Sequence, residues 1–154
     1  MNRFMEIAIQ EASKGMDHNK GGPFGAVVTR DDKIISTAHN EVLKTNDPSA
    51  HAEIIAIMKA SAILDRFDRS DCEIYTTSQP CTMCLSAICW ARIKTIYYGT
   101  TTKDVAEIGF DDDRIYRMLR GDMDSLPINC ENIDSDQCQK LLHEWKLKPD
   151  RMMY

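Results

Sequence analysis

Residues 73–100 read EIYTTSQPCTMCLSAICWARIKTIYYGT, and this stretch decides the fold class that we expect. Glu73–Thr77 and Thr95–Gly99 are rich in β-branched and aromatic side chains, which is typical of strands. Between them, Pro80–Trp90 is largely apolar and is predicted to be a buried helix. Strands that alternate with helices in this way indicate a layered α/β domain with a partly parallel sheet.

The residues before this stretch predict two more helices and a hairpin. MNRFMEIAIQEASKGM has apolar side chains at helical spacing, which indicates an amphipathic helix that stops at Gly15. Residues 26–37 are predicted to form a β-hairpin that turns near residues 30–32. The next helix is expected to begin at Pro48, with Asp47 as its N-cap. After the stretch, the tail from Ser135 is expected to be helical up to about Leu142.

The size and composition of the chain are typical of one soluble domain. Its 154 residues contain 43% hydrophobic and 28% charged residues and no repeat or flexible linker, so we expect one domain over residues 1–154. A net charge of −5 disfavours a nucleic-acid partner. No apolar run approaches the ~20 residues that span a membrane, and the first residues do not resemble a signal peptide. We therefore expect a cytoplasmic protein whose six cysteines are thiols or metal ligands.

Two short segments, HAE at 51–53 and PCTMC at 80–84, predict a catalytic zinc site. His51, Cys81 and Cys84 offer the nitrogen and sulfur ligands that zinc takes, and three protein ligands leave the fourth tetrahedral position for water. Cys81 and Cys84 are three residues apart, which places both on one face of a helix. We expect one zinc ion per subunit. The cysteines without a partner at ligand spacing are Cys72, Cys89, Cys130 and Cys138.

Glu53 is predicted to be the proton shuttle of this zinc site. His51 and Glu53 would point in different directions in the middle of a helix, but at its N-terminus both can face one cavity. Zinc lowers the pKa of its water to ~7, so a neighbouring carboxylate is more useful as a base than as a fourth ligand. A CxxC motif alone is often structural or redox-active, whereas H-x-E followed by P-C-x-x-C is the signature of zinc deaminases.

With these motifs the chain resembles the cytidine deaminase superfamily, and within it the bacterial guanine deaminases. The similar segments are GGPFGAV (21–27), HN (39–40), NDPSAHAE (46–53), PCTMCLSAICWAR (80–92) and AEIGFDDDRIY (106–116). The last segment distinguishes guanine deaminases from tRNA adenosine deaminases, which share the others in part. The resemblance implies a three-layer α/β fold whose mixed five-stranded sheet is flanked by helices. One departure is Gln79, where many relatives have glutamate, and the region 121–138 matches no motif of the family.

The resemblance also implies roles for single residues. Asn40 would hydrogen-bond the purine, and Asp112 would bind its 2-amino group and assist the departure of that group. The C-terminal segment, about 135–154, would be exchanged between the protomers of a homodimer, so that Tyr154 enters the neighbouring active site. The other substrate contacts expected are Phe24, Ala52 and Trp90.

The leading hypothesis is hydrolytic deamination of guanine to xanthine and ammonia. A zinc-activated water attacks C2, and Glu53 protonates the adjacent ring nitrogen and then the leaving amine, with Asp112 as a second shuttle. The run of aspartates at 111–113 also has a structural interpretation, because Asp111 can act as N-cap of a helix over 112–119.

Three alternatives stay open at this point. One is a tRNA adenosine deaminase, since Arg114, Arg117 and Arg120 form a basic row, although the acidic residues of 107–113 oppose it. Another is a deaminase of guanosine or of an aminotriazine. The third is a structural zinc module, in which Glu53 would have to serve as the fourth ligand.

Overall fold

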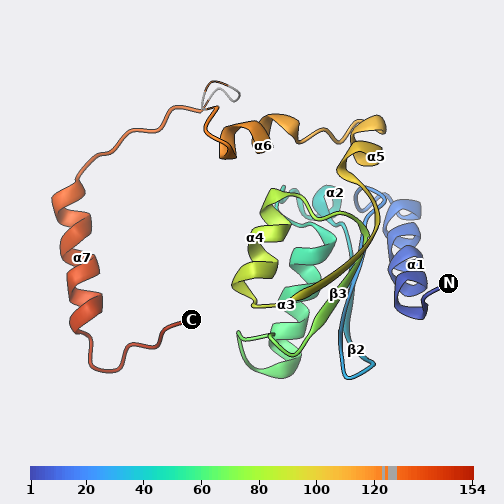
Figure 1. Ribbon diagram of the computed structural model, residues 1–154, viewed down its shortest axis with the longest axis horizontal. Coiled ribbons are helices and arrows are strands. Elements are labelled where there is room, and N and C mark those ends of the chain that lie inside the picture. Colours follow the sequence, from blue (N-terminus) through green and yellow to red (C-terminus); the bar gives the residue numbers. More distant parts are fainter. Residues whose placement is uncertain (123, 125–127) are drawn as a thin grey trace.

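The computed structural model describes residues 1–122, 124 and 128–154 of the chain. In chain order the elements are α1 (Arg3–Asp17), β1 (Gly25–Arg30), β2 (Lys33–His39), α2 (Val42–Thr45), α3 (Ala52–Leu64), β3 (Glu73–Ser78), α4 (Thr82–Trp90), β4 (Thr95–Thr100), α5 (Thr102–Glu107), α6 (Asp113–Leu119) and α7 (Ser135–Leu147). Helix α1 covers one face of the sheet, and α3 and α4 cover the other (Figure 1). The predicted three-layer α/β arrangement is therefore confirmed.

The sheet formed by the described residues has four strands, in the order β2-β1-β3-β4. Strand β1 pairs antiparallel with β2 and β3, whereas β3 and β4 pair in parallel across the crossover helix α4. The expectation of a five-stranded sheet, which came from the family resemblance alone, is wrong. After β4 the chain turns at once into α5, because Thr101 and Asp104 form a capping box that starts a helix.

Two apolar clusters hold the layers together. On one face of the sheet, the fully buried Ala52, Ala56 and Ala60 of α3 belong to a cluster with Val28 and Ile74 of the strands. Alanines have small side chains, so α3 can pack closely against the sheet. On the other face, Phe4, Ala8, Val27 and Tyr75 form the smaller cluster under α1. Neighbouring residues of β1 thus serve opposite faces, as the alternation of side chains along a strand requires.

The start of α3 differs from the prediction in a way that matters for the site. Helix α3 begins at Ala52, with His51 as its N-cap, and not at Pro48. The carboxylate of Asp47 accepts hydrogen bonds from the backbone N–H (2.8 Å) and the hydroxyl (2.6 Å) of Ser49, so it holds a turn and does not cap a helix. This turn leaves His51 with an extended backbone at the mouth of the helix.

Three other helix boundaries also differ from the predictions. Gly15 lies inside α1, which continues to Asp17. Helix α6 begins at Asp113, with Asp112 in the N-cap position. The last helix, expected to end near Leu142, continues to Leu147.

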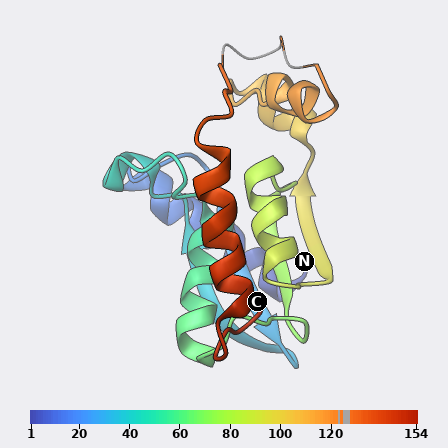
Figure 2. The same ribbon diagram turned by 90° about the vertical axis from the view of Figure 1, so that its left-hand side faces the viewer.

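The C-terminal helix α7 stands apart from the layered body (Figure 1), and Figure 2 shows it in front of that body. Every residue from 128 to 154 is exposed except Ser135, which is half-buried. We refer to residues 128–154 as the C-terminal arm. Of the region 121–138, for which the sequence predicted no role, residues 123 and 125–127 lie outside the described residues. None of the described helices is both long and apolar enough to cross a membrane.

Candidate active site

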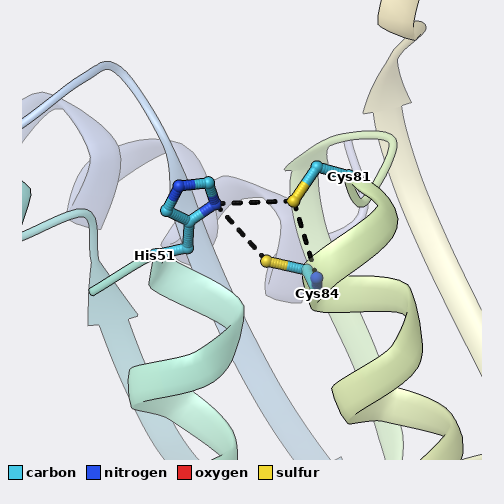
Figure 3. A group of neighbouring side chains, drawn as sticks. All are labelled: His51, Cys81 and Cys84. Atoms are coloured by element: carbon cyan, nitrogen blue, oxygen red, sulfur yellow. Dashed lines mark hydrogen bonds between the residues drawn. The ribbon is translucent and has the colours of Figure 1, made fainter. Parts of the chain in front are cut away.

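Three side chains meet where α3 and α4 begin (Figure 3). His51 is the N-cap of α3, Cys81 is the N-cap of α4, and Cys84 lies in the first turn of α4. Nδ1 of His51 is 3.6 Å from Sγ of Cys81 and 3.5 Å from Sγ of Cys84. The parallel β3–α4–β4 unit and the neighbouring helix α3 thus bring the two predicted ligand segments together.

This donor set fits zinc. A tetrahedral ion with bonds of about 2.3 Å to sulfur and about 2.0 Å to nitrogen would hold its sulfur and nitrogen ligands about 3.5 Å apart. The separations from His51 to Cys81 and Cys84 match that value. Among the described residues, the group holds three protein ligands and no fourth, which is the pattern of a catalytic site.

The charges of the ligands agree with this assignment. The hydrogen bond from the Cys84 thiol is the main reason why the pKa of Cys81 falls to about 4, against the effect of its burial, and His51 adds to the same direction. The pairing with Cys81 and burial together raise the pKa of Cys84. A first thiolate therefore forms readily, whereas a second one beside it needs a cation. Zinc held by His51, Cys81 and Cys84 would supply that cation, and its binding would release a proton.

Glu53 lies in the first turn of α3 and is only 6% exposed. The hydroxyl of Thr76 on β3 donates to Oε1 of Glu53 at 3.2 Å. Burial raises the pKa of Glu53, and the negative charge of Cys81 acts in the same direction. The raised pKa helps this carboxyl group to hold a proton and to pass it on.

A cavity of about 570 Å³ opens beside these residues. His51, Glu53 and Cys81 contribute to its lining, together with residues of three other segments: 21–24, 40–48 and 102–112. The rings of Phe24 and Phe110 meet edge to face with their centroids 5.1 Å apart, which joins the first and last of these segments.

The structure brings most of the predicted site residues to this cavity. Phe24, Asn40 and Asp112 line it with Glu53. Asn40 is 4% exposed, and its Oδ1 accepts a hydrogen bond from the backbone N–H of Val42 at 3.2 Å. One acceptor site of that oxygen is thus occupied, and the Nδ2 hydrogens are the donors that the side chain can offer to a ligand. Asp112 occupies the N-cap position of α6, but its side chain makes no capping hydrogen bond.

Three residues expected to contact the substrate do not line the cavity of their own chain. Ala52 is fully buried in the core cluster beneath α3. Trp90 is 71% exposed at the C-terminal end of α4, about 12 Å along the helix from its first residue at 1.5 Å per residue. Tyr154 is 72% exposed, and its ring lies 6.5 Å from that of Phe67.

Other cavity residues were missed by the sequence reasoning. Thr102 and Val105 of α5 line the cavity from one face of a helix. Their spacing of three residues indicates that they share a helix face, but it does not indicate that this face lines a cavity. Gln79, noted only as a departure from the family, also lines the cavity.

Comparison with known proteins agrees with this geometry. Residues 1–100 match the family described as the cytidine and deoxycytidylate deaminase zinc-binding region. The chain is 46% identical to the guanine deaminase of Bacillus subtilis (strain 168) over 116 residues, which are 75% of this chain and 74% of that protein. It is 36% identical to a tRNA-specific adenosine deaminase of Aquifex aeolicus (strain VF5) over 100 residues, 65% of this chain and 66% of that protein.

The structural comparison extends over the whole chain. An X-ray structure of guanine deaminase from Bacillus subtilis is similar with a TM-score of 0.93 at 37% identity, covering 100% of this chain and 99% of the other. The matched region includes both ligand segments, His51 and the pair Cys81 and Cys84. On this sequence, this fold and this donor set, the chain belongs to the cytidine and deoxycytidylate deaminase family of zinc enzymes.

Proposed function

We propose that the protein catalyses the hydrolytic deamination of guanine to xanthine and ammonia. The observation that carries this proposal is that Asn40 and Asp112 line the same cavity as Glu53 and two of the zinc ligands, His51 and Cys81. The similarity to a guanine deaminase over the full length of the chain supports the same substrate. The volume of about 570 Å³ lies within the range of about 300–1,000 Å³ that is usual for small-molecule sites.

The polar groups of the cavity match guanine better than adenine. Guanine presents two acceptors, O6 and N7, on one edge and an amino donor at C2 on the other. The Nδ2 donor of Asn40 suits the first edge, and the carboxylate of Asp112 suits the second. Adenine has no amino group at C2 and presents an amino donor where guanine has O6.

Glu53 and Asp112 are the groups that move protons in this proposal. Zinc held by His51, Cys81 and Cys84 supplies a Lewis acid that activates water at neutral pH. Glu53 accepts one proton of the attacking water and passes it to the ring nitrogen next to C2. It then takes the second proton, from the hydroxyl now on C2, and gives it to the amine, which leaves as ammonia while C2 becomes a carbonyl. Asp112 hydrogen-bonds the 2-amino group and helps it to depart as ammonia.

A tRNA adenosine deaminase is less well supported. The relative with that activity matches 65% of the chain, whereas the guanine deaminase structure covers all of it, including the segment between α5 and α6 that carries Asp112. The predicted basic row is not available as a whole for phosphates, because Nε of Arg117 donates to Asp122 at 3.0 Å.

The active unit that we propose is a homodimer in which residues 135–154 of each chain pack against the other chain. Helix α7 exposes apolar side chains that a soluble protein normally buries, namely Leu141, Leu142, Trp145 and Leu147. The body exposes a matching set on α3 and α4, namely Met58, Ile63, Leu85 and Trp90. Tyr154 would then complete the cavity of the neighbouring chain. We place this dimer in the cytoplasm, where reducing conditions keep cysteines available for zinc.

One assay tests the substrate. Ammonia release from the zinc-loaded protein is measured with guanine, guanosine, adenine, cytosine, cytidine and an aminotriazine, and with adenosine in tRNA. We expect guanine to have the highest kcat/KM by at least about 100-fold. A substrate that lacks the donor or acceptor groups of guanine leaves buried polar side chains of the cavity without a hydrogen-bond partner. A higher kcat/KM for any other member of the panel would contradict the proposal.

A mixing experiment tests the exchange of the arm. Glu53→Gln and Tyr154→Ala, each expected to be poorly active, are unfolded together and refolded as mixed dimers. If Tyr154 acts on the neighbouring site, half of the sites in a mixed dimer carry both defects and half carry none, so activity returns. Activity that stays at the level of the separate variants would show that Tyr154 acts within its own chain or not at all.

A further inference from the structure

The imidazole of His39 lies between two carboxylates, outside the cavity. His39 is the last residue of β2 and is 6% exposed. Its Nδ1 lies 2.9 Å from Oε2 of Glu11 on α1, and its Nε2 lies 3.4 Å from Oε1 of Glu41, the N-cap of α2. The hydrogen bond with Glu11 therefore joins the end of β2 to α1. The carboxylate of Glu41 lies on the other side of the ring, where Nε2 makes no hydrogen bond among the described residues.

Both carboxylates are held in the ionised form. Burial opposes the ionisation of Glu11, but the hydrogen bond to His39 and the charge of Lys14 outweigh it, so the pKa of Glu11 is lowered. Burial likewise opposes the ionisation of Glu41, and the hydrogen bond and charge of Lys44 lower its pKa. An ionised carboxylate accepts hydrogen bonds and cannot donate them. The ring of His39 is therefore the donor toward Glu11.

The ring is also confined by the backbone of α1. A Cβ atom at Gly15 would lie 2.8 Å from Cβ, Cγ and Cδ2 of His39. The imidazole thus packs directly on the helix at a residue that has no side chain. Since packed interiors leave little free space, the ring has little room to turn unless α1 moves.

Asn40, the next residue, lines the cavity, whereas His39 does not. Its backbone N–H donates to the carbonyl of Phe24 at 3.0 Å, and its Oδ1 accepts from Val42 at 3.2 Å. A Cβ atom at Gly21 would overlap that Oδ1, so the amide sits in a narrow space. The chain is therefore held tightly on both sides of the residue that meets the substrate.

We infer that His39 is a positioning residue for Asn40, because the cluster of Glu11, His39 and Glu41 anchors the end of β2 to α1 and thereby sets the direction of the Asn40 amide. The inference rests on the proposed function for its substrate, but the anchoring itself does not depend on that function. A displacement of about 1 Å in a group that orients a substrate can cost on the order of 100-fold in rate, so an anchor behind Asn40 has a functional consequence.

A kinetic double-mutant cycle tests the link between His39 and Asn40. The zinc-loaded full-length protein is compared with His39→Leu, Asn40→Ala and the double variant, with guanine as substrate. We expect His39→Leu alone to raise KM about tenfold and to raise it less than about twofold in the Asn40→Ala background. His39→Gln, whose amide can still donate to Glu11, should restore most of the affinity. An equal effect in both backgrounds, or no recovery with His39→Gln, would overturn the inference.

A second measurement needs no substrate. The side-chain amide of Asn40 is followed by ¹⁵N NMR in the zinc-loaded protein and assigned by its loss in Asn40→Ala. Its order parameter should be high in the wild type and clearly lower in His39→Leu. An amide that stays equally rigid in His39→Leu overturns the inference, whatever the substrate proves to be. If the NMR change is seen as expected but the protein does not turn over guanine, only the proposed function is contradicted.

A milder pair of variants covers the case in which His39→Leu does not fold. Glu11→Gln keeps the size of the side chain and weakens the bond to His39, whereas Glu6→Gln changes an exposed carboxylate on the same helix. Glu11→Gln should reproduce the loss of order at Asn40, and Glu6→Gln should leave it unchanged. The same response from both variants would overturn the inference.

Discussion

Nδ1 of His51 lies 3.5 Å from Sγ of Cys84, although 33 residues separate them in the chain. The contact exists because α3 and α4 lie side by side on the same face of the sheet and both begin at the same end (Figure 3). A site made from two helix N-termini has a partial positive charge on both sides, which favours thiolate ligands.

The first prediction concerns zinc retention. Cys84→Ser should lower the zinc content of the purified protein by at least about tenfold, because it replaces a soft thiolate with a weakly acidic hydroxyl. The zinc content per chain is measured by elemental analysis after dialysis against a mild chelator. Cys89→Ser on the same helix is the matched control and should keep its zinc, since Cys89 is exposed and outside the ligand group.

The second prediction separates zinc binding from proton transfer. Glu53→Gln should keep one zinc per chain and reduce kcat by about 1,000-fold or more, because an amide cannot accept and return a proton. Zinc content and ammonia release are measured on the same sample. Thr76→Val, which removes the hydroxyl at 3.2 Å from Glu53, should reduce kcat far less. Substantial turnover by Glu53→Gln would contradict the assignment of Glu53 as the shuttle.

The third prediction is that the adjacent residues Asp111 and Asp112 have different roles. The carboxylate of Asp111 accepts the backbone N–H of Asp113 at 3.0 Å and so supports the start of α6. Burial, followed by the negative charge of Cys81, raises the pKa of Asp112, whose side chain makes no capping bond. Asp112→Ala should therefore reduce kcat/KM by about 100-fold or more with little change in Tm.

Asp111→Ala is the matched control for this prediction. It should cost about 1 kcal/mol of local helix stability, the usual cost of losing a capping interaction, and should change kcat/KM much less than Asp112→Ala does. Hydrogen exchange of the α6 amides and steady-state kinetics measure the two effects. An equal loss of kcat/KM in Asp111→Ala and Asp112→Ala would contradict the assignment of Asp111 to helix capping and of Asp112 to substrate binding.

Much of the site was predictable because its determinants are local. The spacing of Cys81 and Cys84 places both on one face of the helix, and the predicted range Pro80–Trp90 places them near its start. The strand–helix–strand order around them predicts a parallel pair and hence the layered fold. His51 was also predicted at the mouth of its helix, although the reason is the Asp47 turn and not an earlier helix start.

What could not be predicted depends on contacts between distant segments. Glu11 and His39 are 28 residues apart, and no spacing rule relates a helix face to the end of a later strand. The exposed position of Trp90 follows from the length of α4, which carries its end away from the cavity. The fifth strand was inferred from resemblance, and the capping box of Thr101 directs the chain into a helix at that point.

The last prediction concerns stability against acid and rests on Asp68, in the loop between α3 and β3. Hydrogen bonds from the side chain and backbone N–H of Ser70 are the main causes that hold the pKa of Asp68 well below its usual range, and Nη1 of Arg92 adds to them at 2.7 Å. A carboxylate whose pKa is lower in the folded than in the unfolded state stabilises the fold above its unfolded pKa of about 3.9. That contribution is lost as the pH falls toward the folded-state pKa.

Asp68→Asn should therefore be less stable than the wild type at pH 7, and the difference should shrink as the pH falls below about 4. The free energy of unfolding in urea is measured for both proteins from pH 7 to pH 3, and the difference between them cancels the titration of all groups that they share. A difference that stays constant or grows toward low pH would mean that the ionised form of Asp68 does not stabilise the loop, because only the loss of a charge-dependent contribution makes the two curves converge in acid.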